Sequence, residues 1–180
     1  MAQEPNIDSL LCELTAVVTA TPERSFFNPP ATESQITVTE SKIGTPLPAS
    51  FKSFLRVFNG GFISVAGTTN DEIWDQDHAE WNSNSLFGTD KLLAEFDDLK
   101  TRFTADLGWK DPWKYVPFCH TDGQELLVFG PLDHTSNECP VLDAFHEVWP
   151  REWGKLYPDF VQLLAAYIAG NGTIKTIAEA

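Results

Sequence analysis

The residue types that commonly carry out catalysis are spread thinly along this chain of 180 residues. Cys119 and His120 are adjacent, and a thiol beside an imidazole could supply a nucleophile and a base. Neighbouring residues on a strand point to opposite faces, however, so these two side chains cannot share a hydrogen bond. We interpret Cys119 as a half-buried residue and His120 as part of a turn. The sequence therefore predicts no catalytic residue and no enzyme.

Metal and nucleotide motifs are missing from the sequence as well. The four histidines show no HExxH spacing, and no GxGxxG or P-loop pattern occurs. His78 lies close to Asp75 and Asp77, which suggests a cation site, but the segment lacks the ligand spacing and central Gly of a calcium loop. We interpret it as a solvated acidic loop, and we expect no metal and no cofactor.

Acidic residues dominate the charge and are segregated along the chain. There are 26 Asp and Glu against 12 Lys and Arg, which gives a formal net charge of −14. Residues 57–90 and 115–150 contain no Lys or Arg at all. Such a charge argues against nucleic acid as a ligand, because phosphates must be met by cations. Two interpretations remain open: a solvated face that aids solubility, or an electrostatic attraction for a basic protein partner.

Two tryptophans stand inside residues 67–85, an acidic segment that we expect to be a long loop. Trp74 and Trp81 have no periodic reason to be buried there, so they are either interface anchors or a lid on the sheet. The residues predicted to bind a protein partner are Asp71, Glu72, Trp74, Asp75, Asp77, Glu80, Trp81, Asp122, Asp133 and Glu138. The tryptophans assigned to packing for the helix that follows, without a binding role, are Trp109, Trp113, Trp149 and Trp153.

Hydrophobic periodicity predicts helices at both ends of the chain around a run of strands. Helices are expected at residues 7–19, 32–43, 49–58, 89 to before 108, and 158–169. Strands are expected at residues 62–66, 115–119, 125–129 and 141–145. Thr89 is expected to cap the fourth helix, and Pro158 is expected to open the last one. This order predicts an α+β fold with a central antiparallel sheet covered by helices.

The first helix carries six apolar positions that must be covered by something. It is expected to fold back on its own domain or to form a symmetric dimer contact, so the chain is a monomer or a homodimer. The three cysteines fit a reducing compartment, and the N-terminus lacks the basic start of a signal peptide. We expect a single cytoplasmic domain.

Residues 40–61 read ESKIGTPLPASFKSFLRVFNGG, an unusual arrangement of turn residues around a short aromatic helix. This segment resembles the signature of the SUKH superfamily, which includes bacterial immunity proteins and Smi/Knr-type regulators of fungal cell-wall assembly. The matching residues are Glu40, Gly44, Leu47, Pro48, Phe51, Phe54, Leu55, Asn59, Gly60 and Gly61. Further matches are Val116-Pro117-Phe118, Asp122-Gly123, Pro140-Val141 and the terminal helix with Phe160, Leu163 and Leu164.

The resemblance covers about residues 36–168 and is weak at residues 67–109. It implies a single SUKH-like domain over residues 1–180, with an N-terminal helical extension at 1–31 and a divergent acidic, Trp-containing insertion at 67–109. It also implies a domain that binds another protein instead of turning over a substrate. The expected role is that of an immunity protein that neutralises a basic toxin domain, in many cases a nuclease. The alternative is an intracellular regulatory scaffold of the cell-wall assembly type.

Overall fold

A seven-stranded antiparallel sheet forms the centre of the computed structural model, in which residues 5–64, 80, 82–122 and 125–174 are described. Each strand pairs with its neighbours in chain order, from β1 at one edge to β7 at the other. The strands are β1 (Ser25–Phe27), β2 (Gly61–Ile63), β3 (Ser85–Leu86), β4 (Val116–His120), β5 (Leu126–Phe129), β6 (Val141–Ala144) and β7 (Gly154–Tyr157). The expected α+β class with a central antiparallel sheet is confirmed.

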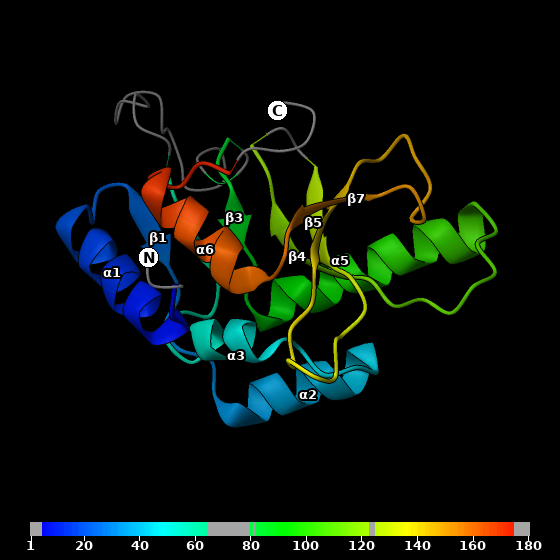
Figure 1. Cartoon of the computed structure of the whole chain (residues 1–180), viewed down its shortest axis with the longest axis horizontal. Coiled ribbons are helices and arrows are strands. Elements are labelled where there is room, and N and C mark those ends of the chain that lie inside the picture. The colour runs from blue at the N-terminus through cyan, green and yellow to red at the C-terminus, as the bar shows by residue number, and fades with distance from the viewer. Residues whose placement is uncertain (1–4, 65–79, 81, 123–124, 175–180) are drawn as a thin grey trace.

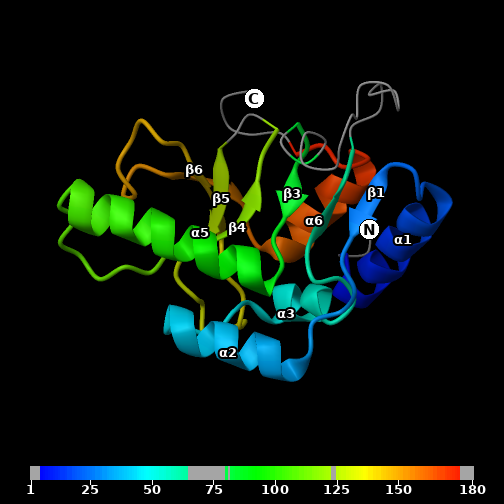
Figure 2. The same cartoon turned by 180° about the vertical axis from the view of Figure 1, so that it is seen from behind.

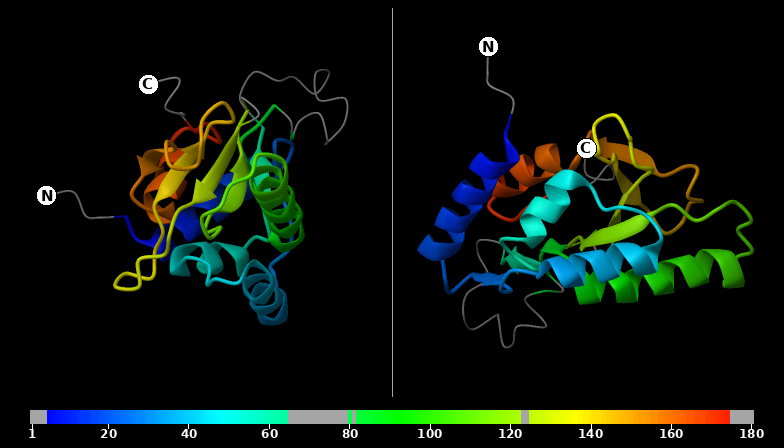
Figure 3. Two further views of the ribbon diagram at one scale, coloured as in Figure 1. Left: turned by 90° about the vertical axis from the view of Figure 1, so that its right-hand side faces the viewer. Right: turned by 90° about the horizontal axis from the view of Figure 1, so that it is seen from below.

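Helices cover both faces of this sheet. They are α1 (Ile7–Ala20), α2 (Glu33–Ile43), α3 (Ala49–Leu55), α5 (Thr89–Thr101) and α6 (Phe160–Ala169), with a π-helical turn η1 (Arg102–Asp106) that continues α5. Figure 1 shows α6 and α1 in front of the sheet, and Figure 2, the view from the other side, shows α5 in front of the opposite face. The two views of Figure 3 place α2 and α3 at one end of the strands. The fold is therefore a sheet between two helical layers, closed at one end.

The first helix folds back onto its own domain, as expected. Asn6 caps it, because its side chain accepts a hydrogen bond from the backbone of Asp8 at 2.9 Å. Leu10, Leu11 and Leu14 are buried, and the helix packs on α6 and α3. The apolar stripe is therefore covered within one chain.

Phenylalanines fill the core between α3, α6 and the sheet. The rings of Phe118 and Phe129, on β4 and β5, stack with centroids 3.9 Å apart. Phe51 from α3 lies edge-on against Phe129 and against Phe160 of α6, with centroids 5.1 Å from each. Phe51 and Phe54 are completely buried, so the aromatic residues of the signature helix serve folding and not contact with a partner.

A second cluster surrounds Phe103 in η1. Its ring lies 5.7 Å from that of Trp113 and 5.5 Å from that of Trp153. The expectation that the late tryptophans pack for the helix that follows them is therefore wrong for this group, which packs at the far end of α5. Trp149 also departs from it, because 45% of its surface is exposed.

Several boundaries also differ from the sequence-based expectation. Strands β1, β3 and β7 were not expected, and α3 ends at Leu55 instead of residue 58. Gly88, not Thr89, occupies the N-cap of α5. Asp159 caps α6, whose first residue is Phe160, so Pro158 precedes the helix. Only residues 62–64 of the strand expected at 62–66 are among those described.

The Asn-Gly-Gly turn of the signature joins three elements. Asn59 accepts a hydrogen bond from the backbone of Thr89 at 2.8 Å through its side-chain oxygen, which ties the end of the α3 segment to the start of α5. Gly60 has φ +82°, and a Cβ placed on it would lie 2.2 Å from the nitrogen of Gly88. Glycine is required here by conformation and by space together.

Gly60→Ala and Gly44→Ala separate the effect of a positive φ from the effect of missing space for a Cβ. Gly44 ends α2 at φ +78°, and a Cβ there would meet nothing within 4 Å, so alanine should cost roughly 1–2 kcal/mol of unfolding free energy from the backbone conformation alone. Gly60→Ala adds the clash with Gly88 and should cost about 3 kcal/mol or more. Urea denaturation of both variants gives the comparison. Equal losses would show that the contact between Gly60 and Gly88 places no constraint on the fold.

Candidate protein-binding surface

The acidic residue of the signature holds the loop between α2 and α3. The carboxylate of Glu40 accepts a hydrogen bond from the backbone of Leu47 at 2.9 Å and pairs with the ammonium of Lys52 at 3.0 Å. These two contacts join the end of α2, the loop and α3 into one unit. Glu40 is thus a framework residue, and its charge is already matched within the chain.

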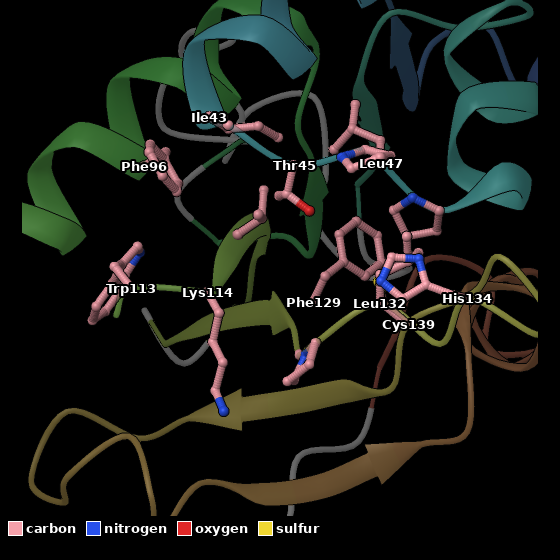
Figure 4. A pocket seen from close by; sticks show the side chains of 16 residues that line it. Ile43, Thr45, Leu47, Phe96, Trp113, Lys114, Phe129, Leu132, His134 and Cys139 are labelled. Atoms are coloured by element: carbon pink, nitrogen blue, oxygen red, sulfur yellow. The ribbon is translucent and has the colours of Figure 1, made fainter. Parts of the chain in front are cut away.

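A cavity of about 220 Å³ lies beneath this loop, between α5 and the strands. Figure 4 shows Ile43, Leu47 and Phe129 around it, while the ammonium of Lys114 points away. Burial raises the pKa of the Cys139 thiol in its wall to about 12, so that thiol stays neutral and unreactive. The apolar side chains in the wall of this cavity could contact an apolar group, but they do not indicate which ligand it would be.

The predicted binding residues are only partly within the described chain. Those outside it are Asp71, Glu72, Trp74, Asp75, Asp77 and Trp81. The described ones are Glu80, Asp122, Asp133 and Glu138. The prediction that Trp74 and Trp81 are either anchors or a lid thus lies outside the described residues.

Glu80 already has partners in its own chain. Its carboxylate accepts a hydrogen bond from the hydroxyl of Ser85 at 2.9 Å and forms an ion pair with Lys91 of α5. Burial works to raise the pKa of Glu80, but the bonds from Lys91 and Ser85 outweigh it, and the pKa lies below its ordinary value. Glu80 therefore stays ionised and links the start of β3 to α5.

The four described acids do not form one surface. Asp122 lies in the turn between β4 and β5, near the end of the sheet where Ser85 pairs with His120. Asp133 and Glu138 lie in the connection between β5 and β6, which leaves β5 at its other end. A small contact with a partner can therefore include Asp122 or Asp133, which lie beyond opposite ends of β5. A contact that includes both must extend along the whole strand.

Asp133 and Glu138 organise their own loop. Asp133 accepts hydrogen bonds from the backbone of Thr135 and the hydroxyl of Ser136, both at 2.9 Å, and these bonds lower its pKa. Glu138 reaches α3, where it accepts from the backbone of Ser50 at 2.9 Å and from its hydroxyl at 2.6 Å. The residue before α3, Pro48, makes no side-chain cap, so Glu138 supplies the missing acceptor from a distant segment.

Glu95 on α5 lies in surroundings that disfavour its ionised form. Burial, together with the nearby charges of Asp98 and Glu80, raises its pKa despite the opposing charge of Lys91. The charged form of Glu95 is therefore disfavoured in the folded chain.

Neither a metal cluster nor a membrane-spanning helix is found within the part of the chain that the structure describes. No group of three or more His, Cys, Asp or Glu residues there is arranged to hold a metal ion. None of the described helices combines the length and the apolar character needed to cross a bilayer.

Glu138→Gln tests whether this acid serves the fold. The two Ser50 donors go to different oxygens of Glu138, and an NH2 group replaces one of these oxygens in the amide. The variant should therefore lose about 1 kcal/mol of unfolding free energy. Glu147→Gln is the matched control, because Glu147 is exposed and makes no hydrogen bond among the described residues. Thermal and urea unfolding measure both. If Glu138→Gln were as stable as Glu147→Gln, the link to α3 would contribute nothing.

Glu95→Gln should stabilise the chain at neutral pH. A carboxyl group whose pKa is higher in the folded chain than in the unfolded chain lowers the free energy of unfolding when the pH is above both values. This loss disappears when the pH falls below the pKa of the unfolded chain, because the group is then protonated in both states. The melting temperature of Glu95→Gln should therefore exceed that of the natural chain at pH 7, and the difference should vanish as the pH falls below about 4. Asp97→Asn, on the exposed side of α5, is the control. A difference that persists unchanged at low pH would contradict the charge argument.

Comparison with known proteins identifies the family. The family model described as SMI1 / KNR4 family (SUKH-1) matches residues 30–166. A search of the curated proteins finds no match. The matched segment runs from the residues before α2 into α6 and includes the turn at Asn59 and the link from Glu40 to Leu47. Because it makes up more than half of the sequence, this chain belongs to the SMI1 / KNR4 family (SUKH-1).

Proposed function

We propose that this chain is a non-enzymatic protein-binding domain that acts as an immunity protein and neutralises a toxin domain by direct binding. The observation that carries the proposal is family membership over residues 30–166, which supports a protein-binding role of the immunity or regulator type. The strong negative charge then favours a basic partner, such as a nuclease that must present cations to phosphate.

The proposed contact is the acidic edge, which we define as Asp71, Glu72, Asp75, Asp77, Glu80 and Asp122. Within it, Glu80 pairs with Lys91 and accepts a hydrogen bond from Ser85. The attraction for the partner is assigned to the summed negative charge of the acidic edge. Trp74 and Trp81, in the same stretch of sequence, are proposed as anchors that are buried when the partner binds. Asp133, exposed at the other end of β5, would add a contact only for a partner that spans the strand.

Binding kinetics against the toxin domain encoded beside this protein test the proposal. Asp71, Asp75 and Asp77 changed together to Ser should chiefly slow association, and the effect should shrink at high salt, where exposed charges are screened. Trp74→Ala or Trp81→Ala should chiefly speed dissociation, at a cost of about 2 kcal/mol or more of binding free energy if the ring is an anchor.

The matched control changes exposed acids elsewhere. Asp97 and Asp98 on α5 lie outside the acidic edge, and their change to Ser should leave both rate constants nearly unaltered. If the association rate constant fell equally in the acidic-edge variant and in the α5 control, the acidic edge would act only through the net charge of the protein and would not be the contact. If the neighbouring gene encodes no toxin and no toxin binds, the regulator role is the one that remains for this family member.

A further inference from the structure

A partly exposed aromatic surface lies at the far end of α5. We call it the aromatic end and define it as Leu107, Trp109, Lys110, Trp149 and Arg151. Figure 1 shows this end of α5 and the connection between β6 and β7 on the opposite side of the molecule from α1 and β1. All five residues are described by the structure.

Two large apolar side chains of the aromatic end face solvent. Trp149 is 45% exposed and Leu107 is 51% exposed. Tryptophan is seldom left so exposed when it only packs a core, and exposed tryptophans are enriched among residues that dominate protein interfaces. The π-helical turn η1 ends just before Leu107, and such turns frequently occur at functional sites.

Ring stacking and an ion pair connect the residues of the aromatic end around a hollow. The rings of Trp109 and Trp149 stack at 6.0 Å with an interplanar angle of 23°. The guanidinium of Arg151 lies 5.1 Å from the Trp109 ring and is fixed by an ion pair with Asp111 at 2.7 Å. A hollow of about 450 Å³ is bounded by both rings, Lys110, Arg151 and Glu152. A preformed aromatic platform lowers the entropy that binding must overcome.

The charge around this platform is opposite to that of the chain as a whole. Residues 100–114 and 146–155 contain six of the 12 Lys and Arg but only four of the 26 Asp and Glu. The ion pair between Asp111 and Arg151 cancels one charge of each sign, which leaves five cations against three acids in these two segments. One of the three acids, Glu152, accepts a hydrogen bond from the backbone of Trp149. Among the described residues, Lys110 and Lys114 form no ion pair. The two segments that carry the aromatic end thus have a net positive formal charge on an acidic protein, and Lys110 is the cation of the hollow without an ion pair among the described residues.

We propose that the aromatic end binds an acidic segment of a second protein, with an apolar side chain of that segment seated against Trp149 in the hollow. Its carboxylates would meet Lys110, which lines the hollow, and the ring stack would bury the apolar group. This site goes beyond the proposed neutralisation of a toxin, since it consists of other residues and selects the opposite charge.

Fluorescence anisotropy with three nine-residue peptides tests the proposal on the full chain. The first peptide carries a Leu-Phe pair flanked by Asp and Glu, the second carries the same pair flanked by Lys, and the third replaces the pair with Ser-Gly between acids. The first should bind most tightly, and Trp149→Ala or Lys110→Glu should weaken it about tenfold or more. Leu107→Ser provides a further surface variant in case Trp149→Ala disturbs folding, which circular dichroism would reveal.

The matched controls lie on α2. Val38 is 46% exposed and Lys42 is exposed on the same helix, so Val38→Ser and Lys42→Glu should bind the first peptide as the natural chain does. The proposal is overturned if the acidic Leu-Phe peptide does not bind, if the lysine peptide binds as well, or if the α2 variants weaken binding equally. It is also overturned if sedimentation shows that the natural chain is a dimer and that Trp149→Ala is a monomer, because a second copy of the chain then covers this surface.

Discussion

The close approach of two backbone segments at Gly60 and Gly88 is the constraint on which the rest of the domain depends. A Cβ on Gly88 would lie 2.2 Å from the carbonyl oxygen of Asn59, so neither position has room for a side chain. The side chain of Asn59 completes the junction by accepting from the backbone of Thr89. Through it, the α3 segment, β2 and α5 are fixed relative to one another, and α5 carries η1 and the tryptophan cluster at its far end.

The two proposed contacts of this domain differ in charge. Residues 71–80, which precede β3 in the sequence, carry six acidic or aromatic candidates for binding a basic partner and no Lys or Arg. At the far end of α5, cations and exposed rings gather where α5, η1 and the connection between β6 and β7 meet. Family membership supports binding to proteins, and the two proposed contacts, one acidic and one with exposed rings and cations, can be tested separately.

Hydrophobic periodicity was sufficient to predict the helices, because α1 and α6 show complete apolar stripes and their burial follows them. The strands of four or five residues in the middle of the sheet were also predictable, whereas β1 and β3 have too few residues to show any alternation. Long-range contacts left no local signal. In the sequence, Glu138 is one more acid in a charged turn, yet it completes the start of α3, which lies 88 positions earlier in the chain. Trp149 resembles the packing tryptophans near it, and only the three-dimensional arrangement shows that part of its ring is open to solvent.

Hydrogen exchange of the chain with and without the toxin domain tests the central claim most directly, since it reports where the partner lies on the natural protein. The account predicts slower exchange in the backbone of residues 71–81 and around Asp122, with no change at residues 107–113 or in the turn after Trp149. Slower exchange confined to the aromatic end, with residues 71–81 and Asp122 unaffected, would contradict it.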